Sequence, residues 1–149
     1  MAATVREAMR ELLEQTMVTM DALLAASDEE LAMPSSHACA QGRDLWTLIT
    51  NDIDHEKIHT GQVIEARHEA RITPSPAQRL LAEWLAERAR FIGSLVGLTD
   101  EQFNAETAPG QWTYRVVAKH VLMIEQDSLK AIAADRADAH HEGLLRDQR

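Results

Sequence analysis

The sequence predicts an all-α protein, a four-helix bundle built from an internal two-fold repeat of a helix pair. Its 149 residues suffice for one domain with a core, and 45% of them are hydrophobic, which argues against disorder. Six glycines and four prolines are few for this length. In four long stretches, apolar residues recur every three to four positions, the spacing typical of amphipathic helices.

The first half of the chain predicts two long helices joined by a capped turn. Helical spacing of apolar residues runs from about Thr4 to Ala25. Ser27–Glu30 has the form of a capping box, which predicts a short helical turn, and Ser35–Gly42 then forms a loop. Asp44 is the expected N-cap of a second long helix that fades near Arg71.

The second half predicts the same succession of elements. Ser75 is the expected N-cap of a third helix and Pro76 its first residue, because proline is favoured at that position. Thr99–Gln102 repeats the capping-box pattern, and Thr113 caps a fourth helix. The segment 139–149 is expected to be a C-terminal tail, which leaves 1–138 as the helical domain.

The two halves also resemble each other in sequence. LLAASDEEL precedes the second helix, and SLVGLTDEQF precedes the fourth. Aligning these two helices pairs Asp44 with Thr113 and Asn51 with His120. A repeat of helix, capped turn, loop and helix predicts a pseudo-symmetric four-helix bundle.

Charge and composition exclude several classes of partner. The net charge of −9 disfavours nucleic acid and anionic membranes as partners, because both attract basic surfaces. No stretch approaches the roughly 20 apolar residues that cross a bilayer, and the N-terminus lacks the apolar run of a signal peptide. Cys39, as the single cysteine, excludes an internal disulfide. A cytoplasmic location is expected.

Three histidines predict a metal site. His55 and His59 lie one turn apart on the apolar side of the second helix, so their imidazoles can reach one ion. His120, near the apolar stripe of the fourth helix, is the expected third ligand. Three histidines with an open fourth position are typical of a catalytic divalent site, with zinc or nickel as the expected metal. The alternative is three core histidines, each hydrogen-bonded to a polar neighbour.

Two other metal-site classes fit less well. HEKIH matches the zinc-peptidase signature, but Gln62 and Glu65 replace the Gly and His of the extended pattern, and no strand is evident to bind a peptide. Glu56 and His59 form half of a di-iron site. In the second half of the repeat, Ser128 replaces the histidine, so this site is incomplete.

Two stretches carry a resemblance to a known family. GQWTYRVVAKHVLMIEQDSL is similar to a helix with the pattern W-S-x-x-x-x-x-x-H-x-x-x-x-E, and IDHEKIHTGQV to one with H-x-x-x-H. On these stretches the chain resembles the DinB-like superfamily over about Val5–Asp135. That group includes bacterial thiol-dependent transferases and the mycothiol-dependent maleylpyruvate isomerase.

The resemblance implies a homodimeric four-helix bundle with a three-histidine divalent metal site. His120 matches the single ligand of the family, and His55 and His59 match the paired ligands. Their order along the chain is reversed here, because the family's single histidine generally comes first. Leu122 and Leu129 lie off the main stripe of the fourth helix, which independently favours a second buried face and a homodimer.

The family also implies an activity. The expected function is a metal-dependent enzyme that activates a low-molecular-weight thiol for transfer to a small electrophile. The same three-histidine site could instead hold a metal-bound hydroxide and make the protein a hydrolase. The remaining alternative is a non-catalytic divalent-metal-binding or stress-response interaction protein.

Overall fold

A computed structural model describes the backbone of residues 4–146 and the side chains of residues 4–136. Within this part the regular secondary structure is helical, with two isolated β-bridges in the loops. The prediction of an all-α chain is therefore confirmed. No helix in the same range is both long and apolar enough to span a membrane. The chain divides into two units, Met1–Thr73 and Pro74–Arg149.

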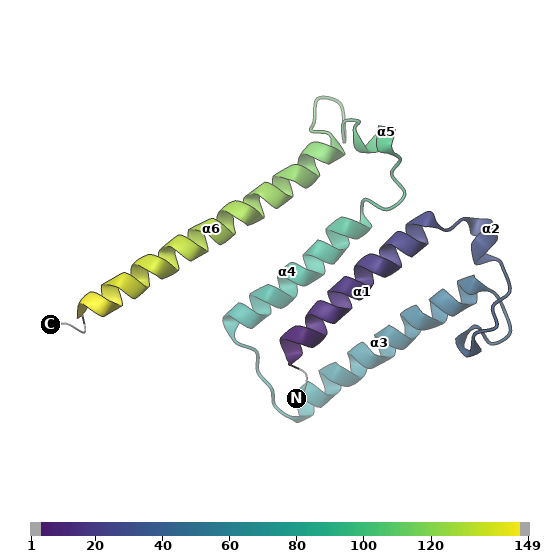
Figure 1. Cartoon of the computed structure of the whole chain (residues 1–149), viewed down its shortest axis with the longest axis horizontal. Coiled ribbons are helices and arrows are strands. Elements are labelled where there is room, and N and C mark those ends of the chain that lie inside the picture. The colour runs from purple at the N-terminus through teal and green to yellow at the C-terminus, as the bar shows by residue number, and fades with distance from the viewer. Residues whose placement is uncertain (1–3, 147–149) are drawn as a thin grey trace. The chain divides into compact units, whose positions relative to one another are not determined.

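The first unit contains two long helices, a short helix and one 3-10 turn (Figure 1). In chain order these are α1 (Val5–Ala25), α2 (Asp28–Leu31), η1 (Ala38–Ala40) and α3 (Leu45–Glu69). Thr4 and Ser27 form capping boxes at the starts of α1 and α2.

The loop of the first unit closes back on the start of α3. Pro34 pairs with Asp44 in an antiparallel bridge, and the N–H of Leu45 donates to the carbonyl of Met33 at 3.0 Å. These contacts fix where α3 begins. They therefore fix the register of every side chain that the helix carries, including both of its candidate metal ligands.

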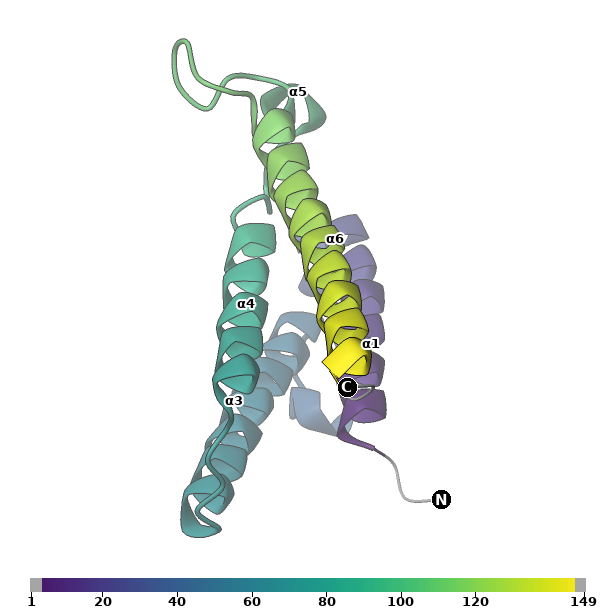
Figure 2. The ribbon, with the colours of Figure 1, turned by 90° about the vertical axis from the view of Figure 1, so that its left-hand side faces the viewer.

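The second unit contains α4 (Pro76–Gly93), α5 (Asp100–Phe103) and α6 (Tyr114–Arg146). Ser75 and Thr99 form capping boxes at α4 and α5, and Glu106 pairs with Thr113 in a bridge before α6. Figure 2 shows α6 as one uninterrupted helix. Its backbone includes residues 139–146, so the prediction that a tail begins at residue 139 is wrong for this stretch. Helix-favouring residues such as Ala, Leu, Glu and Arg are frequent in this stretch and sustain the helix.

Both units show the same succession of elements. In each, a long helix is followed by a four-residue helix with a capping box, a loop closed by a β-bridge, and a second long helix. This is the succession that the sequence repeat leads one to expect. The order of elements does not by itself establish the bundle or the two-fold repeat, and both stay predictions.

The apolar stripes of the long helices are largely exposed. Among the described side chains, only Ala40 and Thr47 are buried. Large apolar residues on every long helix are about half exposed or more, for example Leu12 (67%), Ile53 (50%), Leu80 (67%) and Ile124 (51%). A helix stripe is covered only when another apolar element packs on it. The predicted core is therefore not assembled within either unit.

The N-cap of α3 makes stability depend on pH. Hydrogen bonds from the side chain and the backbone N–H of Thr47 hold the pKa of Asp44 below its ordinary value of 3.8. Because the folded pKa is the lower one, the stabilisation is present above the ordinary value and is lost as the pH falls through the folded pKa. We expect Asp44→Asn, which keeps a good N-cap, to be less acid-sensitive than the wild type.

Urea unfolding of both proteins between about pH 7 and about pH 3 measures this difference. The stability advantage of the wild type over Asp44→Asn should shrink, or reverse, below about pH 4. A difference that stays constant over the whole range would contradict this role for the carboxylate.

Candidate functional site

Two imidazoles on α3 converge on one point. The Nε2 atoms of His55 and His59 lie 2.8 Å apart, with ring centroids separated by 4.5 Å and ring planes tilted by 44°. The spacing of four residues places the two side chains one above the other on the same helical face. Both imidazoles are exposed, so an ion in solution can reach them. The structure thus brings together the pair of ligands that the sequence predicts.

Gln62 orients the second imidazole of the pair. The Nδ1 atom of His59 lies 2.7 Å from Oε1 of Gln62. A carbonyl oxygen can only accept, so Nδ1 carries the proton and donates it. In neutral His59 the Nε2 atom then holds a free lone pair, and it accepts a hydrogen bond from Nε2–H of His55. In the sequence, Gln62 stands out only as a mismatch to the peptidase pattern. Its position three residues after His59, on the same face, is the signal that could have revealed this contact.

The geometry of the pair fits a metal ion. Two nitrogen ligands at about 2.0–2.1 Å from one ion are separated by about 2.8–3.0 Å at a right angle and by about 3.3–3.4 Å at a tetrahedral angle. The observed 2.8 Å is close to the lower value, so a small ring rotation suffices. The described part of the chain contains no group of three or more His, Cys, Asp or Glu side chains that could hold a metal ion. His55 and His59 are therefore two candidate ligands, and both their role and the third ligand stay predictions.

His120, the predicted third ligand, belongs to the second unit. It lies on α6 and is partly buried, and its ring meets Trp112 edge-on with centroids 4.9 Å apart. It also lines a groove of about 860 Å³ between α4 and α6. The rest of the groove lining is mainly apolar: Leu80, Leu81, Trp84, Arg88, Val121, Ile124, Glu125, Ser128 and Leu129.

An ion pair crosses this groove. Arg88 of α4 binds Glu125 of α6, and its guanidinium lies over the ring of Trp84, 5.0 Å from the centroid. Both charged side chains are about a quarter exposed, at 24% and 27%. The pairing gives Glu125 a structural role in joining two helices. The role of Arg88 could not be predicted from the sequence, because no local pattern shows which residue faces a partner on another helix.

Asp52 and Asp127 lie on the same helices as the predicted ligands, but among the described side chains neither forms a hydrogen bond to an imidazole. Asp127 accepts from Nζ of Lys130 at 2.9 Å, within its own helix. Asp52 lines a pocket together with His55, but no hydrogen bond joins the two side chains. The structure therefore gives the orienting role to Gln62, and only for His59.

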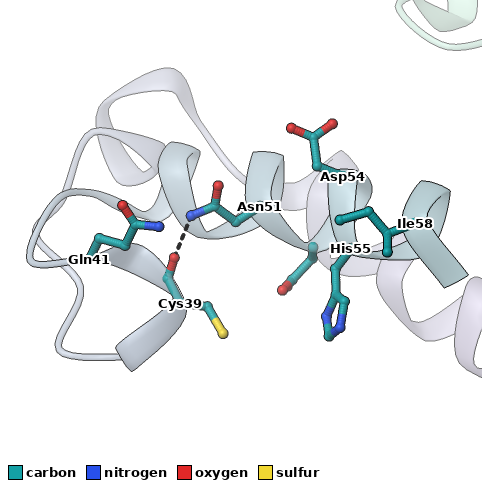
Figure 3. Close-up of a pocket in the computed structure, with 7 residues that line it drawn as sticks. Cys39, Gln41, Asn51, Asp54, His55 and Ile58 are labelled. Atoms are coloured by element: carbon teal, nitrogen blue, oxygen red, sulfur yellow. Dashed lines mark hydrogen bonds between the residues drawn. The ribbon is translucent and has the colours of Figure 1, made fainter.

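A small pocket adjoins His55 in the first half of α3 (Figure 3). It measures about 300 Å³ and is formed by α3 and the 3-10 turn η1, with Cys39, Gln41, Asn51, Asp52, Asp54, His55 and Ile58 in its lining. Asn51 donates from Nδ2 to the carbonyl oxygen of Cys39 at 2.6 Å and so holds η1 against α3. The carboxylate of Asp54 points to the opposite side of the helix from the His55 ring and pairs with Lys57. A small molecule in this pocket would lie beside the imidazole of His55.

Comparisons of the chain with models of known protein families, with curated proteins and with solved structures found no match. The resemblance to the DinB-like superfamily therefore rests on the two histidine-bearing stretches and the pattern of capped turns, and membership stays a prediction.

Proposed function

We propose that this chain is a metal-dependent enzyme of the DinB-like type that activates a low-molecular-weight thiol for transfer to a small electrophile. In this proposal His55, His59 and His120 hold one divalent ion, zinc or nickel. The observation that carries it is the convergence of the two Nε2 atoms on α3, 2.8 Å apart. Two imidazole nitrogens directed at one point are a typical half of a divalent metal site.

The third ligand requires the four long helices to form a bundle, which we propose as the assembled fold. The exposed apolar stripes support this assembly, because side chains such as Ile53 and Ile124 gain stability only when covered. Each such side chain contributes about 1.5–3 kcal/mol when fully buried. The partial burial of His120 beside apolar neighbours agrees with a position at the edge of such a core.

A second face of α6 supports a homodimer. Leu122 follows His120 by two residues and so lies about 200° away around the helix. Leu122 and Leu129 are 48% and 58% exposed. Leu122 does not line the groove beside His120, so a bundle that closes this groove leaves Leu122 outside, where a second copy of the chain can cover it.

The chemistry follows from the ligands. A bound divalent ion favours the thiolate over the thiol, whose ordinary pKa is about 8.5, and so supplies a nucleophile at neutral pH. The histidines would hold the ion through neutral nitrogens, and Gln62 would keep His59 in the required tautomer. In the transfer, the sulfur forms a bond to the electrophilic carbon, the leaving group departs with its bonding electron pair, and the thiol proton passes to solvent. The pocket beside His55 offers space for a small reactant.

The test is a thiol-transfer assay on zinc- or nickel-loaded protein. Glutathione, cysteine, bacillithiol and mycothiol are each offered with a chromogenic electrophile. We expect a rate above background with at least one thiol, and a return to the metal-free rate in His120→Ala. His68→Ala is the matched control, because His68 is an exposed histidine at the last turn of α3. No rate with any thiol, and none with ester substrates, would favour a non-catalytic metal-binding protein.

A further inference from the structure

The hydrogen bond between His59 and Gln62 has a consequence for how a metal enters the site. A neutral imidazole carries one proton, on Nδ1 or on Nε2, and only the other nitrogen can bind a metal. In a free histidine side chain in solution, no hydrogen-bond partner selects one of these two tautomers. At His59, Nδ1 lies 2.7 Å from Oε1 of Gln62, and because a carbonyl oxygen can only accept, a neutral ring in this contact carries its proton on Nδ1.

We propose that Gln62 is a positioning residue that presents the Nε2 lone pair of His59 to the metal before the metal arrives. This inference rests on the proposed metal site and adds the residue that prepares it. His59 then needs no change of tautomer on binding. In contrast, His55 donates Nε2–H to His59 in the metal-free pair and must move or lose that proton. The two proposed ligands therefore differ. His59 already presents an Nε2 lone pair, whereas His55 must first move or lose its Nε2 proton.

The placement of Gln62 is suited to this role. It lies on α3 itself, three residues after His59, so helix geometry alone brings the two side chains together. The contact consequently does not depend on how the rest of the chain packs. A neutral amide also orients the ring without adding a charge next to the ion. Partners that orient metal-binding histidines in this way typically change metal affinity by about 10–100-fold.

Nitrogen-15 NMR of the imidazoles in the full-length, metal-free protein tests the tautomer directly. Above about pH 8, where an ordinary imidazole is neutral, we expect wild-type His59 to be protonated on Nδ1. Gln62→Met, which has similar length and no strong acceptor, should give a mixture of the two tautomers. Gln62→Glu keeps an acceptor and should restore the Nδ1–H form. A wild-type His59 protonated on Nε2, or a Gln62→Met spectrum unchanged from wild type, overturns the proposal.

Zinc titration provides the second measurement. We expect Gln62→Met to bind zinc about tenfold more weakly than wild type, and Gln62→Glu to bind at least as tightly. Gln126→Met makes the same replacement at an exposed position of α6 and should leave the affinity unchanged. Equal affinity of wild type and Gln62→Met overturns the positioning role. If wild-type protein binds no zinc, the metal site fails and this inference with it. The NMR result distinguishes that case, because the tautomer is measured without metal.

Discussion

Replacing His55 with alanine is expected to lower the zinc affinity of the protein by about 100-fold or more. Four-ligand zinc sites bind with apparent free energies of about 10–16 kcal/mol, so one ligand contributes on the order of 3 kcal/mol. The same loss is expected for His59→Ala, because each variant removes one of the two imidazoles whose Nε2 atoms lie 2.8 Å apart. Competition with a chromophoric chelator, on protein purified without a histidine tag, measures the affinity.

His68→Ala is the control for this experiment. It removes an imidazole from the same helix, at an exposed position in the last turn of α3. Its zinc affinity should equal that of the wild type. If His55→Ala also binds zinc as the wild type does, the pair on α3 is not the site, and the proposed function loses the observation that carries it.

Leu122→Glu is expected to convert the proposed dimer to monomer. Burying an uncompensated carboxylate costs more than burying a neutral polar group, which alone costs about 2–7 kcal/mol. The dimer dissociation constant should therefore rise by at least about 30-fold, since 1.4 kcal/mol corresponds to tenfold. Sedimentation equilibrium at several protein concentrations measures the change from a species of twice 16.7 kDa to one of 16.7 kDa.

Gln111→Glu adds the same charge in an exposed loop and should leave the association state unchanged. Circular dichroism of both variants verifies that the helices remain. A wild-type protein that sediments only as a monomer at high concentration would contradict the dimer itself. A Leu122→Glu protein that remains dimeric would place the interface on another face.

The helices and their starts could be predicted because the signals are local. Asp44, Ser75 and Thr99 cap the helices that the sequence assigns to them, and each accepts a hydrogen bond from a backbone N–H three residues later. The pairing of His55 with His59 was predictable for the same reason, since it depends only on a spacing of four residues in a helix. The extension of α6 to Arg146 was not predicted, because the tail lacks a clear apolar stripe although its composition favours a helix.

Side-chain contacts between different helices could not be predicted in detail. The pairing of Arg88 with Glu125 joins residues 37 positions apart, and many charged side chains could have satisfied either partner. The same limit applies to the predicted core. A stripe that includes Ile53 shows which side of α3 must be covered but not which element covers it. The role of Gln62 could not be predicted for a different reason. It concerns the position of one proton on His59, which hydrophobic periodicity does not report.

The closed loops before α3 and α6 have a consequence for the kinetics of folding. The hydrogen bond from Leu45 to Met33 and that from Asn51 to Cys39 each span twelve residues, and in the described part only the Arg88–Glu125 bond spans more. Loops of about ten residues close in about 10–100 ns, and helices form within about 1 μs. The paired imidazoles of α3 should therefore exist in the folding chain before its distant parts meet. In the second unit we expect the slower step to be the one that brings α4 and α6 together, and formation of the Arg88–Glu125 contact reports it.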